Sequence, residues 1–124
     1  MKNKKEFVYL VGDCGPEHNT VLSIHRTYEG ALKAWNRLRI ELLKDAKHML
    51  QSSKEDARKH LEKGKWDTED KPFSQDTVNY FNKIAENGNE IYLEMIEKLS
   101  CEDPKKIDNY PQETPYIYKE EIED

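Results

Sequence analysis

The stretch from Phe7 to Trp35 constrains the fold of this chain more than any other. It reads as an apolar segment FVYLV, a turn-rich break GDCGPEHN, a second apolar segment around VLSIH, and then TYEGALKAW. Strong β-formers fill the two apolar segments, and glycine, proline and asparagine separate them. This order predicts a β-hairpin that leads directly into a helix, and the rest of the chain has to pack against that frame.

The helix after the hairpin is the clearest single element in the sequence. Thr27 can accept a hydrogen bond from an unpaired backbone N–H as an N-cap. Apolar residues then recur in steps of three and four: Ala31, Trp35, Leu38, Leu42, Ala46 and Met49. This stripe predicts a helix from about Tyr28 to Gln51. The serines at 52–53 resemble a capping-box restart, so residues 54–63 are predicted either to extend this helix or to project from it.

The second half of the chain carries further start and stop signals. Ser74 is placed to cap a helix that ends at Asn87–Gly88, a good helix stop. Residues 89–100 fit a helix but also alternate as a strand would, and we favour a helix because their charged residues suit a solvated helical face. The closing segment YIYKEEIE predicts a strand.

Together these segments predict an α+β fold with a three-stranded antiparallel sheet, formed by the hairpin and the C-terminal strand and packed on a long helix. We expect a single domain over residues 1–124. The hairpin and long helix occupy residues 7–51, a helical insertion residues 52–110, and the closing strand residues 115–123.

The composition points to a small core. Charged residues make up 36% of the chain, and Leu, Ile, Val and Phe account for 25 of its 124 residues. The regular helical spacing still favours a folded domain over disorder. A small core also makes a homo-oligomer a reasonable expectation, because an interface between copies can supply the missing burial.

The charge is unevenly distributed along the chain. Residues 33–65 carry ten basic and five acidic side chains, whereas residues 66–124 carry six basic and sixteen acidic ones. We expect the two regions to lie against each other rather than to face separate partners. Nucleic acid is not an expected partner, since the isoelectric point is near 5.4.

The sequence predicts a cytoplasmic protein without a membrane segment. Its longest apolar run, FVYLV, is far shorter than a signal-peptide core or a spanning helix. Cys14 and Cys101 form no disulfide framework, so both thiols are expected to be free.

Catalytic motifs are weak throughout. Cys14 and His18 could form a nucleophile–base pair, or half of a metal site completed by other histidines or by Cys101. An ordinary turn between two strands is the reading we favour, because no ligand spacing is paired and no glycine-rich phosphate loop is present. We therefore expect a protein that is not an enzyme and has no cofactor and no metal.

Aromatic and arginine side chains are the better candidates for binding. Tyrosine and tryptophan in or beside the irregular segments offer rigid contact area with a polar tip, and arginine can pair with phosphate or carboxylate. The candidate binding side chains are Arg26, Arg37, Trp66, Tyr110, Tyr116 and Tyr118. The alternative role of these aromatics is to clamp the proline-rich return segment to the helices.

The frames VLSIHRTYEGALKAWNRLRIELL and DNYPQETPYIYKEEIE resemble a group of small uncharacterised proteins from phages and mobile elements of Gram-positive bacteria. The matching positions are Thr27, Glu29, Ala31, Trp35 and residues 116–123, and Gly30 departs from the pattern. The resemblance implies a β-hairpin–helix–strand protein, encoded by a phage and acting in the host cytoplasm by binding host or defence components. It carries over no functional residue.

Two functions follow as hypotheses. The first is a non-catalytic, phage-type accessory protein with an anti-defence role that binds a host or defence protein. The alternative is a homo-oligomer that sequesters a small anionic ligand such as a nucleotide signal, with Trp66, the tyrosines and Arg26 or Arg37 lining the pocket.

Overall fold

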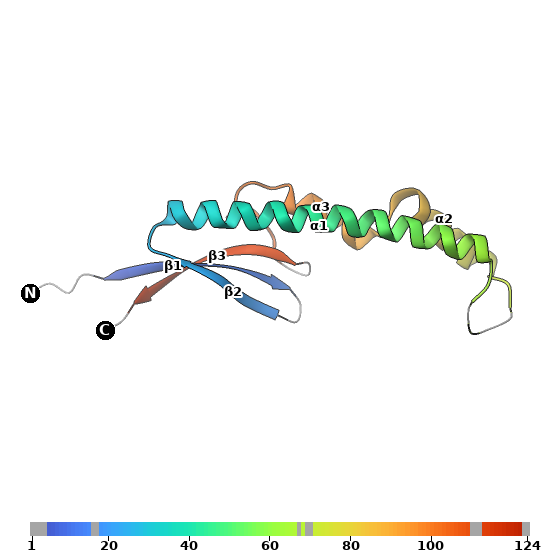
Figure 1. The fold of residues 1–124 in the computed structure, drawn as a ribbon, viewed down its shortest axis with the longest axis horizontal. Coiled ribbons are helices and arrows are strands. Elements are labelled where there is room, and N and C mark those ends of the chain that lie inside the picture. The colour runs from blue at the N-terminus through green and yellow to red at the C-terminus, as the bar shows by residue number, and fades with distance from the viewer. Residues whose placement is uncertain (1–4, 16–17, 67, 69–70, 110–112, 123–124) are drawn as a thin grey trace, which may run out of the picture. The chain divides into compact units, whose positions relative to one another are not determined.

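A computed structural model describes residues 5–15, 18–66, 68, 71–109 and 113–122 (Figure 1). Its elements in chain order are β1 (Glu6–Gly15), β2 (His18–His25), α1 (Tyr28–Lys63), α2 (Gln75–Asn87), α3 (Glu90–Leu99) and β3 (Thr114–Ile122). The chain forms two compact units, one of residues 1–44 and 97–124 and the other of residues 45–96. We call them the sheet unit and the helical unit.

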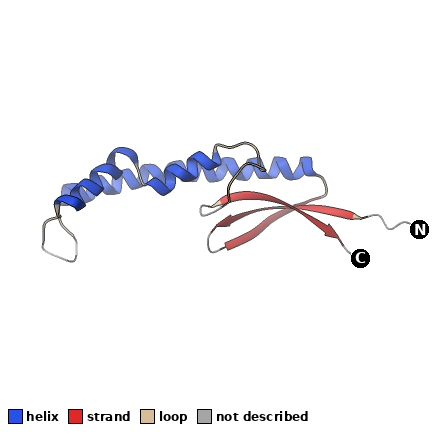
Figure 2. Ribbon diagram, turned by 180° about the vertical axis from the view of Figure 1, so that it is seen from behind, coloured by secondary structure: helices blue, strands red, loops and turns tan. Residues whose placement is uncertain are grey.

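The sheet unit contains the predicted three-stranded antiparallel sheet, in the order β2-β1-β3 (Figure 2). The first and last strands of the chain therefore lie side by side, and the predicted α+β class is confirmed. The strands are longer than predicted because β3 pairs with β1 from Glu6 to Cys14. The β1–β2 register shifts after Val11, so that Leu22 is an extra residue of β2 at a bulge.

The N-terminal part of α1 covers one face of this sheet (Figure 1). Val11, Ala31, Trp35 and Ile107 form its buried core, and Trp35 is fully buried. Tyr9 borders this core, and its ring lies edge-on to that of Tyr28 with centroids 5.7 Å apart. The apolar stripe of the predicted helix thus packs on the sheet, as its spacing indicated.

The predicted helix boundaries are confirmed at their caps. The Thr27 Oγ1 accepts a hydrogen bond from the N–H of Gly30 at 3.1 Å, and the Ser74 Oγ accepts one from the N–H of Thr77 at 3.2 Å. The backbone N–H of Gly88 donates to the carbonyl of Ile84, which closes α2. Residues 90–99 are helical, as favoured over the strand.

The first helix extends through residues 54–63, which confirms the first of the two predicted alternatives, and it does not restart at the serine pair. Ser53 does not cap a new helix: its hydroxyl donates to the carbonyl of Leu50 at 2.6 Å and accepts from the N–H of Asn89 at 3.1 Å. Because this serine is used inside the helix and at the α2–α3 junction, α1 continues to Lys63.

Candidate binding surfaces

The second face of the sheet is lined with apolar side chains. Residues opposite each other on neighbouring strands share a face of the sheet. One row across the strands is Tyr118, Leu10 and Ile24, and the next is Tyr116, Gly12 and Val21. The open sheet face comprises Val8, Leu10, Val21, Ile24, Tyr116 and Tyr118, with Cys14, Asn19 and Glu120 at its rim. Ile24, Tyr118 and Val21 are 65%, 57% and 47% exposed, which is high for their residue types.

A groove with a volume of about 610 Å³ lies on the open sheet face, lined by Leu10, Cys14 and Val21 among others. Because Gly12 has no side chain, the Thr20 carbonyl and the Tyr116 hydroxyl can lie close to its backbone. A Cβ atom there would come within 2.7 Å of the Tyr116 hydroxyl and 2.0 Å of the Thr20 carbonyl oxygen. Burial, followed by the negative charges of Cys14 and Asp13, raises the pKa of Tyr116 above its ordinary value of 10.0. The Tyr116 phenol therefore holds its proton more tightly than a fully exposed tyrosine does.

The helical unit has a groove of its own, which we call the helical groove. It has a volume of about 460 Å³, and its lining comes from α1, α2 and the start of α3. Its residues are Met49, Ser52, Ser53, Asp56, Ala57, His60, Tyr80, Phe81, Ile84, Asn89 and Tyr92. Ala57 and Phe81 are buried, and the His60 ring stacks on Phe81 with centroids 4.9 Å apart. Tyr80 and Met49 remain 59% and 43% exposed.

Trp66 belongs to an aromatic cluster in the helical unit. Its ring lies edge-on to Phe73 and to Phe81, with centroids 4.9 Å and 6.0 Å apart, yet it stays 44% exposed. A separate groove of about 330 Å³ is lined by Lys59, His60, Lys63, Lys65, Trp66 and Thr68. The exposed indole thus borders a surface with lysine side chains.

The predicted binding residues do not all meet. Tyr116 and Tyr118 come together in the groove of the open sheet face. Arg26 and Arg37 are exposed in the same unit, and neither is among the described residues that line that groove. Trp66 belongs to the helical unit. Tyr110 lies outside the described residues.

Sequence reasoning missed the strand residues of the open sheet face and most of the helical groove. The signal for the first was present in the segments FVYLV and VLSI, which are apolar at successive positions instead of alternate ones. The helical groove had no comparable signal, because its lining combines apolar and polar residues that are dispersed over three helices.

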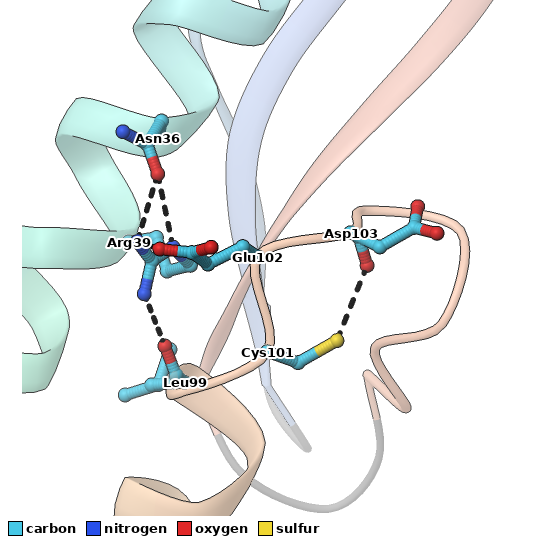
Figure 3. A network of polar contacts seen from close by, with 6 residues as sticks. All are labelled: Asn36, Arg39, Leu99, Cys101, Glu102 and Asp103. Carbon is cyan, nitrogen blue, oxygen red and sulfur yellow. Dashed lines mark hydrogen bonds and ion pairs between the residues drawn. The ribbon is translucent and has the colours of Figure 1, made fainter.

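A buried arginine, also missed, fixes the end of α3 within the sheet unit (Figure 3). Arg39 is 6% exposed, and its Nη1 donates to the carbonyl of Leu99 at 2.7 Å. Its Nε and Nη2 donate to the Asn36 Oδ1 at 3.1 and 2.8 Å. The guanidinium carbon also lies 5.9 Å from the Trp35 ring centroid. These contacts give Arg39 a structural role in joining α1 to α3.

Cys14 lies near the end of β1 and His18 at the start of β2, so they belong to paired strands and not to a turn, and they do not form a nucleophile–base pair. The register places Asn19 opposite Cys14 and His18 opposite Gly15, so the two candidate side chains fall on opposite faces of the sheet. The His18 Nε2 instead lies 3.5 Å from the Asp13 Oδ1. Across the described residues, no three His, Cys, Asp or Glu side chains gather as metal ligands would.

Comparison of the chain with protein-family models, with curated proteins and with solved structures finds no match. The resemblance to phage proteins therefore stays a prediction. None of the helices in the described part of the chain has the length and apolar character needed to cross a bilayer.

Proposed function

We propose that this protein is a non-catalytic binding protein that holds a partner protein in the helical groove. The observation that carries the proposal is the groove itself, an open channel of about 460 Å³ between helices with an apolar floor and a polar rim. Its lining offers side chains for both apolar contact and hydrogen bonding.

The groove fits an amphipathic segment of a partner. Ala57, Phe81 and Ile84 give it apolar contact surface, and Ser52 and Asp56 lie beside them. Amphipathic helices bind in such grooves by placing apolar side chains at helical spacing on the floor. A partly exposed tyrosine at the edge, here Tyr80, is the residue type most often found to dominate such contacts.

The phage resemblance supports a host or defence protein as the partner. A short accessory protein of that kind acts by occupying a surface of another protein, and the groove offers a surface for this. The resemblance and the partner class are both parts of the proposal.

Capture from a lysate of a Gram-positive host tests this function. The wild-type protein and two variants, Tyr80→Asp and Ile91→Asp, serve as baits, and bound proteins are quantified by mass spectrometry. Ile91 is a matched control because it is 48% exposed in the same unit and is not among the described residues lining the groove. A charge at Tyr80 should reduce specific capture at least tenfold, whereas Ile91→Asp should leave it unchanged.

Two results would count against the proposal. One is a wild-type bait that enriches no protein above background. The other is a captured protein that binds all three baits equally, since its contact would then avoid the helical groove. Circular dichroism of each variant checks that its helices are intact.

A second candidate function has one observation in its favour. The exposed Trp66 and the side chains of Lys59 and His60 line the same small groove, an arrangement that suits stacking and charge pairing with a nucleotide-like anion. Thermal unfolding against a nucleotide panel tests it. A ligand at a hundred times its dissociation constant stabilises the folded state by about 2.7 kcal/mol. No shift with any nucleotide, or an equal shift in Trp66→Ala, removes this candidate.

A further inference from the structure

Over residues 7–11 of β1, both alternating sets of side chains are apolar. Tyr9 and Val11 pack toward α1, whereas Val8 and Leu10 fall on the open sheet face. An antiparallel sheet with one solvated face normally alternates apolar and polar residues along each strand. The pattern of β1 is therefore typical of a strand covered on both faces. In the sheet unit, the described elements cover only the face toward α1 (Figures 1 and 2).

The open sheet face is uncharged at its centre. Its two middle rows hold only Tyr118, Leu10 and Ile24, then Tyr116, Gly12 and Val21. Glu120 is the one charged side chain among the described residues that line its groove, and it lies outside the two middle rows, opposite Val8. Two identical copies of this face can meet without opposing like charges at the centre, and a charged partner surface would find no counter-charge there.

The same face has both a projection and a hollow. Tyr118 is 57% exposed and stands at the edge of the groove of about 610 Å³. A two-fold contact requires a surface that is complementary to itself, so that residue i of one copy meets residue j of the other and the reverse. A projecting side chain beside a hollow meets that requirement.

The size of the face also fits a weak dimer. Three strands about 4.8 Å apart, with about eight residues of ~3.3 Å each, give a projected area of roughly 380 Å². The accessible area is larger because side chains stand out from the sheet. Two facing copies have a projected total of roughly 760 Å². The larger accessible area brings the contact toward the small end of specific interfaces, for which the total buried area is about 1,200 Å².

We propose that the open sheet face is covered by the same face of a second copy, so that two sheets pack as a sandwich about a two-fold axis. Sheets packed in this way lie about 10 Å apart with interdigitated side chains. The contact gives the chain a second apolar layer, which adds to the burial that its small proportion of Leu, Ile, Val and Phe provides.

Size-exclusion chromatography coupled to light scattering measures the mass of the full chain and so tests for the dimer. The protein concentration runs from about 1 µM to about 500 µM, a range suited to a micromolar dissociation constant. Ile24→Lys and Tyr118→Lys place a charge on the open sheet face at well-exposed positions. Ile40→Lys is the matched control, because Ile40 is 52% exposed on α1. The wild-type mass should rise from 14.7 kDa toward twice that value. The two face variants should weaken dimerisation at least tenfold, and the control should match the wild type.

Chemical labelling of Cys14, at the rim of the open sheet face, tests whether this face forms the contact. Cys14 lines the groove and is half-buried. In a protein that carries only Cys101→Ser, the rate at which a thiol reagent labels Cys14 should fall as the protein concentration rises. With Ile24→Lys added, the rate should not depend on concentration.

Three results overturn the proposal. A wild-type protein that stays monomeric at every concentration shows that a second copy does not cover the face. A dimer that resists both lysine variants, or one that leaves Cys14 labelling unchanged, uses another surface. None of these results bears on the helical groove, because the Tyr80→Asp and Ile91→Asp baits test partner capture separately.

Discussion

Arg39 makes the most demanding single contact of the sheet unit. It donates to the carbonyl of Leu99, the last residue of α3, from a position that is 6% exposed. Arg39→Met keeps the length of the side chain and removes every donor, which leaves that carbonyl without its charged partner. We expect the free energy of unfolding to fall by about 2 kcal/mol, the usual cost of a hydrogen bond to a charged group. Urea denaturation monitored by circular dichroism measures this change in the free energy of unfolding.

The matched control is Arg37→Met, on the same helix but exposed. It should change the free energy of unfolding by less than about 0.5 kcal/mol, as surface substitutions usually do. Glu102→Gln should also have little effect, since Glu102 is 85% exposed and lies 3.8 Å from the Arg39 Nη2. Equal losses for Arg39→Met and Arg37→Met would contradict the structural role of Arg39.

Tyr116 predicts a pH dependence of stability. Burial raises its pKa above 10.0, with smaller effects from Cys14 and Asp13. The folded protein thus holds the phenol proton more tightly than the unfolded chain. The resulting contribution to stability is complete below pH 10 and is lost as the pH rises through the raised pKa. Between pH 8 and about pH 11.5, the wild type should lose more free energy of unfolding than Tyr116→Phe. The same dependence of the free energy of unfolding on pH in the two proteins would contradict this prediction.

At the scale of an element, the junction of α2 and α3 depends on one glycine. Gly88 has φ 83° and ψ 171°, a region of backbone conformation that is almost restricted to glycine. A Cβ atom there would also lie 2.1 Å from the Leu50 Cδ1. Gly88→Ala should therefore destabilise the protein by about 2–3 kcal/mol in urea denaturation. Asn87→Ala, at the exposed end of α2, should cost far less, and equal costs would show that the junction tolerates a side chain.

The helix ends that have local signals were predicted from the sequence, whereas the end of the first helix was left open between two alternatives. The caps at Thr27 and Ser74 and the stop at Gly88 are local hydrogen bonds, so residue type alone indicates them. The sequence left open whether the first helix extends past Gln51 or projects from it, and in the structure α1 extends while Ser53 bonds to Asn89, 36 residues away. No local pattern shows such a pairing, and the serines alone resemble a new start.

At the scale of the whole molecule, the pairing of the first and last strands could be predicted from their composition and order. The candidate binding surfaces could be predicted only in part. Tyr116 and Tyr118 share a groove because they are two residues apart on one strand. The predicted set also included Trp66 and two arginines, although spacing along the chain cannot indicate which side chains share a surface. Arg39 was overlooked for a related reason, since its burial depends on Leu99, 60 residues away.

The two-unit organisation predicts that the sheet unit folds without residues 45–96. Its core residues Val11, Trp35 and Ile107 all lie in the retained segments. The Arg39–Leu99 hydrogen bond shows that α1 and α3 are neighbours there, and packed helices are about 10 Å apart. A six-residue Gly-Ser linker, which spans about 20 Å, is long enough to join them.

Removing residues 45–96 also removes Trp66, so that Trp35 becomes the only tryptophan of the chain. Because Trp35 is fully buried, its fluorescence should be blue-shifted and should match that of full-length Trp66→Phe, which is the control. Urea should then produce a single cooperative transition. The shortened protein should dimerise through the open sheet face and capture no partner protein. An emission maximum typical of exposed indole would show instead that the sheet needs the helical unit to fold.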